Sequence, residues 1–297
     1  MAAKTGPTIR RMQLGQELRR LREQVVSEDG SRGLTRGQAV RGTSVSESTL
    51  HRVEKGLTSL PKAQELTELL ERYGVDEPGD VEFLLDIHKN SLNRGWWSPY
   101  RLFMPSGFNI SVGLEGDAKI LRVYQPDVMF GLFQTASYAR AQFEVAKPID
   151  ERTTEFVERN VEIRMRRKES ITRGDRPVEV HAILDEAVLR RVFGGSEVMR
   201  EQYDHLAELA SLEHVTVQIL PMGQPVYRCS QNFVLMEFEP PLPTVVSVDG
   251  FSAVSVTDKD TEIWAYKRRF DAMRAEAGAP RETPEFLKRA ARELEQP

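Results

Sequence analysis

The 297-residue sequence contains a single cysteine and no run of about 18 apolar residues. One cysteine excludes a disulfide framework within the chain, and it excludes zinc or iron–sulfur sites built from several cysteines. Without a long apolar run, no segment is predicted to span a membrane. The first 20 residues lack the apolar core of a signal peptide, so we expect a cytoplasmic protein.

Familiar catalytic and cofactor motifs are also absent. The sequence has no HExxH, no GxSxG, no Walker A loop and no GxGxxG. We therefore expect no enzymatic activity, no cofactor and no metal. Glu179, His181 and Asp185 lie near one another in the sequence, which makes a metal site conceivable. We interpret them instead as polar residues along a half-exposed strand.

The composition, 40% hydrophobic and 29% charged, is that of a globular protein, and the length suggests about two domains. Charge is unevenly distributed along the chain. Residues 1–73 hold 13 lysines and arginines against nine acidic residues, a net charge of +4. The remainder holds 28 against 36, a net charge of −8. This asymmetry suggests that only the N-terminal part meets a polyanion.

Hydrophobic periodicity and turn residues predict an α+β protein. We expect an N-terminal all-α domain at 10–75, a connecting helix and aromatic linker at 76–105, and an α+β domain with a small sheet at 106–297. Residues 1–9 are expected to form a disordered tail. In the C-terminal domain the patterns predict helices near 117–122, 135–146, 150–171, 196–212, 258–277 and 283–295, and strands at 178–184, 215–220, 232–238 and 244–248.

The stretch from Leu34 to Gly56, LTRGQAVRGTSVSESTLHRVEKG, is typical of a helix-turn-helix. Thr35 and Gln38 have the spacing of a capping box at the start of the first helix. Ala39 supplies the small residue where two helices approach, and Gly42, Thr43 and Ser44 form the turn. The second helix begins after Ser46 and ends at Gly56. Its inward anchors are Val45, Leu50 and Val53.

This stretch resembles the five-helix DNA-binding domains of the phage-repressor or xenobiotic-response-element (XRE) type. The matching features are Leu-Thr at the first helix, Val-Ser before the second, then Ser-Thr-Leu and Glu-Lys-Gly. The resemblance implies that Glu47, Ser48 and Thr49 contact base edges. It also implies phosphate contacts from Arg36 and Arg52, and Ser46 can offer its backbone amide at the helix N-terminus. Two departures are a longer link before Leu34 and a serine, Ser44, at the usual turn glycine.

Later stretches resemble a large family of actinobacterial regulators that join this type of DNA-binding domain to a C-terminal domain of unknown function and are described as antitoxin-like. The stretches are GWWSPY (95–100), VGLEGDAKILRVYQPDVMFGLFQTASYARA (112–141), ILDEAVLRRVFGG (183–195), MREQYDHLAELASLEHVTVQILP (199–221) and EIWAYKRRFDAMRAEA (262–277). The resemblance implies a role in developmental or secondary-metabolism genes, often beside a gene for a small companion protein. MGQPVYRCS (222–230) departs from the histidine- and glycine-rich turn common in the family.

Two groups of residues in the C-terminal part have alternative interpretations. The aromatic residues Trp96, Trp97 and Tyr100, with others farther along, either line an effector pocket or fill a core. The basic run Arg164, Arg166, Arg167, Lys168 and Arg173 is interpreted as a solvated helix face rather than a second nucleic-acid contact.

The sequence therefore predicts a sequence-specific transcriptional regulator that binds double-stranded DNA at an inverted-repeat operator as a homodimer. Its C-terminal domain is expected to dimerise, to sense a small-molecule effector, or to bind a small companion protein. When bound to DNA it would be associated with the nucleoid. Two alternatives remain: an antitoxin that sequesters its companion protein and autoregulates, and an enzyme fused to a DNA-binding domain.

Overall fold

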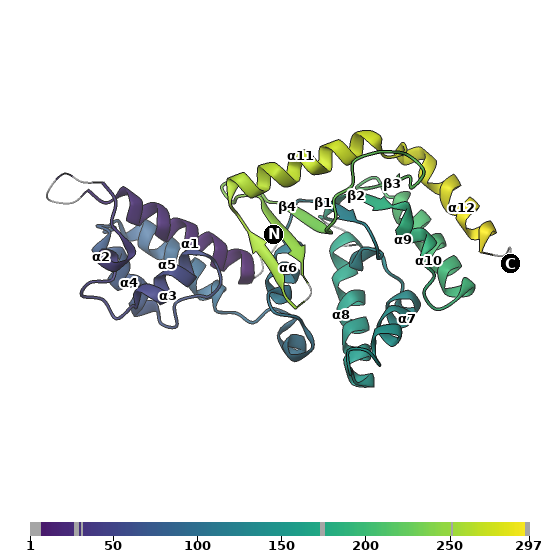
Figure 1. Ribbon diagram of the computed structural model, residues 1–297. Helices are drawn as coiled ribbons and strands as arrows, with labels where there is room; N and C mark the ends of the chain where they lie inside the picture. The colour runs from purple at the N-terminus through teal and green to yellow at the C-terminus, as the bar shows by residue number, and fades with distance from the viewer. Residues whose placement is uncertain (1–6, 27–29, 31, 173–175, 251, 295–297) are drawn as a thin grey trace. The chain divides into compact units, whose positions relative to one another are not determined.

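The computed structural model describes residues 7–26, 30, 32–172, 176–250 and 252–294. The chain divides between Ser98 and Pro99 into two compact units, which we call the N-terminal unit and the C-terminal unit (Figure 1). The N-terminal unit is helical, and the C-terminal unit is a mixed α/β domain with a six-stranded sheet. This arrangement confirms the predicted fold class. No helix in the described ranges is long and apolar enough to cross a membrane.

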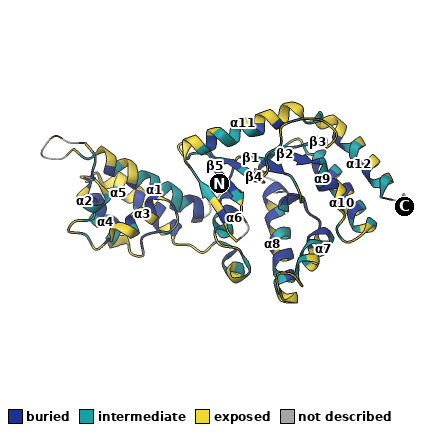
Figure 2. Ribbon diagram, viewed as in Figure 1, coloured by how far each residue is buried: buried dark blue, intermediate teal, exposed yellow. Residues whose placement is uncertain are grey.

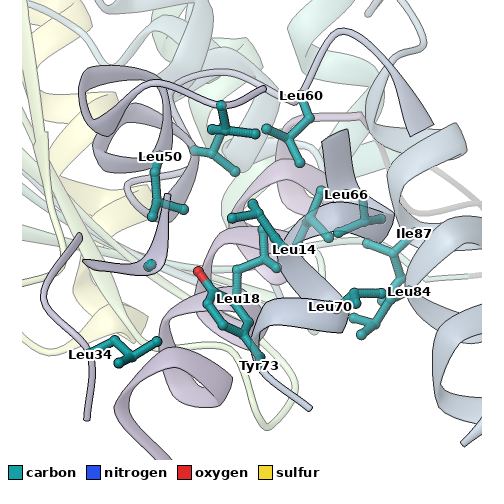
Figure 3. Close-up of a cluster of buried hydrophobic side chains, with 14 residues drawn as sticks. Leu14, Leu18, Leu34, Leu50, Leu60, Leu66, Leu70, Tyr73, Leu84 and Ile87 are labelled. Atoms are coloured by element: carbon teal, nitrogen blue, oxygen red, sulfur yellow. The ribbon is translucent and has the colours of Figure 1, made fainter. Parts of the chain in front are cut away.

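The N-terminal unit packs its helices around one apolar core, drawn in Figure 3. Leu14 and Leu18 on the first helix are fully buried against Leu50, Leu66 and other leucines of the later helices. The α-helices described in this unit are α1 (Pro7–Gln24), α2 (Arg36–Ala39), α3 (Glu47–Glu54), α4 (Ala63–Arg72) and α5 (Pro78–Ser91).

The start of α1 differs from the sequence prediction. The tail expected over residues 1–9 is wrong for its last three residues, because α1 begins at Pro7 and Ile9 is 1% exposed. Residues 1–6 of that prediction lie outside the described residues. At the other end of the unit, α5 contributes Leu84 and Ile87 to the same core as α1.

The C-terminal unit alternates helices and strands. Its described elements are η1 (Ser98–Phe103, whose first residue precedes the division), α6 (Phe108–Glu115), β1 (Ile120–Gln125), η2 (Gly131–Phe133), α7 (Ala136–Ala146), α8 (Thr154–Thr172), β2 (Glu179–Asp185), α9 (Glu186–Arg190), α10 (Ser196–Ala210), β3 (Val215–Leu220), β4 (Phe233–Glu237), β5 (Val245–Asp249), β6 (Val254–Thr257), α11 (Asp260–Glu276), η3 (Pro280–Glu282) and α12 (Thr283–Glu293).

The six strands lie in the order β3-β2-β1-β4-β5-β6. β1, β2 and β3 are parallel to one another, whereas β4 pairs antiparallel with β1 and continues as a meander through β5 and β6. In register, Val123 of β1 lies opposite Ala182 of β2 and Val234 of β4. The chain therefore changes from parallel to antiparallel pairing at β1, in the middle of the sheet.

Helices cover both faces of the sheet. One face carries Tyr124, Phe233 and Val246, which pack against Ile263 and Phe270 of α11. The helices α6 and α8 cover the opposite face of the sheet. Figures 1 and 2 show the sheet between α11 and these two helices, and Figure 2 shows buried residues on its strands. A hydrogen bond of 3.0 Å from the Ser247 hydroxyl of β5 to the Ser111 hydroxyl joins α6 to this second face.

Most predicted elements of the C-terminal unit lie within a few residues of the observed ones, including α7, α8, β3 and α11. The helix predicted near 117–122 is wrong: Ile120–Gln125 forms the central strand β1. The helices α6 and α9 and the strand β6 were not predicted from the sequence. β1 was not predicted as a strand because its neighbours in the sheet, β2 and β4, lie more than 50 residues away in the chain. Local periodicity carries no information about such distant partners.

Candidate nucleic-acid interface

The helix-turn-helix predicted from residues 34–56 is present, and local hydrogen bonds define its ends. At the start of α2 the Thr35 hydroxyl accepts from the Gln38 amide at 3.2 Å, while the Gln38 side chain accepts from the Thr35 amide at 2.8 Å. This reciprocal pair is the capping box expected from the spacing. Ala39 is fully buried, as a close approach of the two helices requires.

The turn between the helices is held by α4. The Ser44 amide and hydroxyl both donate to the carboxylate of Glu68, at 2.6 and 2.7 Å. These two hydrogen bonds, the backbone one first, lower the pKa of Glu68 below its usual value. The serine that replaces the usual turn glycine therefore has a structural role, which fixes the turn on the neighbouring helix.

The N-terminus of α3 is capped by Ser46, whose hydroxyl accepts from the Thr49 amide at 3.1 Å. The Ser46 and Thr49 hydroxyls also lie 2.8 Å apart and share a hydrogen bond. Thr49 is half-buried, and its hydroxyl is therefore engaged within the helix end. The predicted base contact from Thr49 would have to share this hydroxyl with the cap.

The outward face of α3 carries exposed polar side chains. Glu47, Ser48 and Arg52 are exposed, and within the described ranges their side chains make no hydrogen bond or ion pair. His51 is exposed on the same face, three residues after Ser48 and four after Glu47. Sequence reasoning missed His51, although this helical spacing was available to find it. The inward side holds Val45, Leu50 and Val53, which are 5%, 0% and 0% exposed, as predicted.

A buried ion pair fixes the other end of α3. Glu54, with a side chain 1% exposed, accepts from Arg22 of α1 through both carboxylate oxygens, at 2.5 and 3.1 Å. Arg22 also donates to the Leu34 carbonyl at 2.6 Å. Burial opposes the charged form of Arg22, but the hydrogen bond and charge of Glu54 outweigh it and raise the pKa of the guanidinium. Arg22 therefore joins α1 to α3 and to Leu34, two residues before the start of α2.

Arg36, predicted to contact phosphate, belongs to the same network. Its Nε donates to Oε2 of Glu54 at 2.7 Å, and its side chain remains 32% exposed. Glu54 thus orients a partly exposed guanidinium at the start of α2. Sequence reasoning missed Arg22 and Glu54 because the pair spans 32 residues of sequence.

Close backbone approach holds α3 on α1. A Cβ added at Gly15 would lie 2.2 Å from the carbonyl oxygen of Val53, so only glycine fits there. After α3, Gly56 has φ +66 and its amide donates to Val53, while the Leu57 amide donates to the Arg52 carbonyl at 3.0 Å. This is a Schellman end, which requires the left-handed conformation that glycine adopts readily. The helix α3 is therefore fixed at its cap, its anchors and its C-terminus.

Of the candidate effector residues, Trp96 and Trp97 belong to the end of the N-terminal unit and Tyr100 to the start of the C-terminal unit. The Trp96 and Trp97 rings meet edge to face with centroids 6.0 Å apart. Trp97 is 8% exposed and its ring lies against Gly95, whereas Trp96 and Tyr100 are half-buried. Of the aromatic residues farther along the chain, Tyr124 is buried under α11 and Phe133 is fully buried beside Phe130.

The polar residues considered for a metal site make other interactions. His181 Nε2 lies 2.6 Å from Glu179 Oε1, and Asp185 caps α9 and pairs with Arg228 at 2.9 Å. Among the residues that the structure describes, no group of three or more histidine, cysteine, aspartate and glutamate side chains is placed to hold a metal ion.

Comparison with known proteins agrees with this division of the chain. Residues 13–83 match the model of a helix-turn-helix domain, which covers α3 and its supporting helices. Residues 110–289 match the model of a domain of unknown function, DUF5753. Neither the curated proteins nor the solved structures give a match. Because the second match covers well over half of the 297 residues, this chain belongs to the DUF5753 family and carries a helix-turn-helix domain at its N-terminal side.

Proposed function

We propose that this protein is a sequence-specific transcriptional regulator whose N-terminal unit is of the XRE, phage-repressor type. In this proposal α3 enters the major groove of double-stranded DNA. Glu47, Ser48 and Thr49 contact base edges near its N-terminus. Arg36, Arg52 and the backbone amide of Ser46 contact phosphates, which sets the register of the helix on the duplex.

The observation that carries the proposal is the contrast between the two sides of α3. The inward side is fixed by buried anchors, by Ser46 and by the buried carboxylate of Glu54. On the outward side Ser48 and Arg52 are exposed and, within the described ranges, have no internal partner. A rigid helix with unpaired polar side chains on one face suits the reading of base edges, because its donors and acceptors need no rearrangement before binding.

Phosphate contacts from Arg36 depend on Glu54. The 2.7 Å bond from Nε to Glu54 holds one edge of the guanidinium and leaves a partly exposed side chain. A guanidinium oriented in this way loses little conformational entropy when it meets a phosphate. Arg52 is exposed one turn after Ser48 on the same helix, and it supplies the second positive charge.

We further propose that the protein binds an inverted repeat as a homodimer and that the C-terminal unit forms the dimer. A single helix-turn-helix contacts only a short half-site, and two-fold dimers place two such helices about one helical turn apart. The C-terminal unit acts in binding and regulation rather than in catalysis. Its effector is a small molecule or a small companion protein, with Trp96, Trp97 and Tyr100 as one candidate place for it.

Selection from a random duplex pool tests the proposal. Full-length protein is incubated with the pool, bound DNA is sequenced, and the mass of the complex is measured by light scattering. We expect enrichment of an inverted repeat whose half-sites lie about 10 base pairs apart, or a multiple of this, with two chains bound. Absence of any enriched sequence contradicts the proposal. A monomer bound to a single half-site contradicts its dimeric part. Copurification of a stoichiometric short polypeptide from native cells would favour the antitoxin alternative.

A further inference from the structure

A polar cavity of about 90 Å³ lies in the C-terminal unit, at the carboxyl end of β1. Its wall includes Gln125, the last residue of β1, together with Ser247 of β5 and residues of α6 and α8. Here the neighbours of β1 are the parallel strand β2 and the antiparallel strand β4. The carboxyl edge of such a strand, where the order of the sheet reverses, is a frequent place for ligands in open α/β sheets.

Two charged side chains in this wall form an ion pair with each other. Arg167 of α8 is 8% exposed and donates through Nε and Nη2 to the two oxygens of Glu115 of α6, at 2.9 and 2.7 Å. Its guanidinium also lies against Gly131, where an added Cβ would be 2.8 Å from Nη1. Arg167 was expected on a solvated helix face, and that expectation is wrong for this residue. Its charge is neutralised by Glu115.

Arg164 lines the same cavity one turn earlier on α8, and it forms no ion pair with any described residue. Arg164 is half-buried, and its Nε, which is buried, makes no hydrogen bond to any described residue. Its guanidinium carbon stacks 4.2 Å from the centroid of the Phe143 ring. Burial, and then the positive charge of Arg167, lower the pKa of Arg164 to about 9. Asp249 at the cavity wall opposes this shift but forms no ion pair with Arg164.

A second residue of the cavity wall also carries an unmatched polar atom. Gln134 is 1% exposed, and its Nε2 donates to the Met129 carbonyl at 2.8 Å and to Oε1 of Gln142 at 3.1 Å. These two bonds fix the orientation of the amide, which leaves Gln134 Oε1 buried without a partner among the described residues. The cavity thus offers a positively charged donor and a neutral acceptor, and buried groups of either kind are rarely left unpaired.

We propose that this cavity binds a small carboxylate that also carries a hydroxyl or amino group, such as a two- or three-carbon hydroxy acid or amino acid. The carboxylate of the ligand accepts from Arg164, and its hydroxyl or ammonium group donates to Gln134 Oε1. A cavity volume of about 90 Å³ limits the ligand to a small molecule, of roughly five or six non-hydrogen atoms.

This binding is independent of DNA, so it is tested without DNA on the full-length protein. Isothermal titration at pH 7 uses glycolate and glycine as probes, with acetate, ethylene glycol and inorganic phosphate as comparisons. We expect saturable binding of glycolate or glycine at one site per chain, binding of acetate about tenfold weaker, and no binding of ethylene glycol. Failure of both glycolate and glycine to bind overturns the proposal. Phosphate or acetate binding as tightly as these probes also overturns it.

Variants distinguish a ligand site from a structural arginine. Arg164→Gln should abolish binding of the probe without lowering the melting temperature, because it removes a positive charge that has no ion-pair partner among the described residues. The matched control Arg166→Gln changes an exposed residue of the same helix and should leave binding unchanged. If Arg164→Gln binds the probe like the parent, or only lowers the melting temperature, the arginine is structural and the proposal fails.

Asp249→Asn provides a test that leaves Arg164 unchanged. Asp249 is exposed at the cavity wall and accepts from Asn232 at 3.0 Å. Removing its negative charge should tighten glycolate binding several-fold, since a like charge near the carboxylate is lost. Unchanged or weaker glycolate binding in this variant would place the anion elsewhere and overturn the assignment.

Discussion

Replacing Glu54 with glutamine tests whether the buried ion-pair network of Arg22, Arg36 and Glu54 holds α3 in place. The change keeps the size and shape of the side chain but removes the charge that faces Arg22, whose side chain is 8% exposed, and Arg36. Arg22 would remain buried without a counter-charge. Removing one partner of a buried pair costs about 3–5 kcal/mol, and the amide retains some hydrogen bonding, so we expect about 3 kcal/mol.

For a domain the size of the N-terminal unit, about 3 kcal/mol corresponds to a melting temperature lower by roughly 12–24 °C. Thermal unfolding followed by circular dichroism measures this shift, and urea unfolding measures the free energy at constant temperature. The matched control is Glu71→Gln, an exposed residue of α4, for which we expect a change within about 0.5 kcal/mol. A melting temperature for Glu54→Gln within about 4 °C of the parent would refute the structural role assigned to the network.

Three further variants test other contacts. Gly15→Ala places a Cβ 2.2 Å from a backbone oxygen of α3, and we expect it to lower the free energy of urea unfolding by about 1–3 kcal/mol. The pKa of Glu68 is lowered by its bonds from Ser44, so this stabilisation is present above the ordinary carboxyl pKa and is lost as pH falls through the lowered one. The difference in stability between parent and Glu68→Gln should therefore shrink on acidification; a difference that stays constant with pH contradicts this. Arg167→Met should destabilise strongly, and the double change with Glu115→Leu should recover most of the loss in thermal melting.

The helix-turn-helix could be predicted from sequence because its determinants are local. The capping box of Thr35 and Gln38, the turn after Val40, and the anchors Leu50 and Val53 all lie within about 20 residues. Each sets a backbone conformation or a helical face that the residue types reveal directly. The same reasoning could not find the ion pair between Arg22 and Glu54, because helical spacing carries no information about a partner 32 residues later.

The cavity in the C-terminal unit could not be predicted for the same reason. Arg164 and Arg167 resemble a solvated basic run in the sequence. Arg167 is buried against Glu115, 52 residues earlier, and both arginines line a cavity with Gln125 of the strand that begins at Ile120. That strand was itself mistaken for a helix. Charged residues on a helix are read as exposed unless a distant partner is known, and such partners follow from the fold rather than from spacing.

The most direct test of the account compares Ser48→Ala with Arg52→Ala, both exposed on α3 and both without an internal partner among the described residues. Equilibrium binding to the selected operator and to a scrambled duplex is measured over a range of salt concentrations. Arg52→Ala should weaken both complexes and reduce the salt slope by about one unit. Ser48→Ala should weaken only the operator complex, by about 1–3 kcal/mol, with loss of preference at particular bases. The account is contradicted if Ser48→Ala weakens both duplexes equally while Arg52→Ala relaxes a single base position.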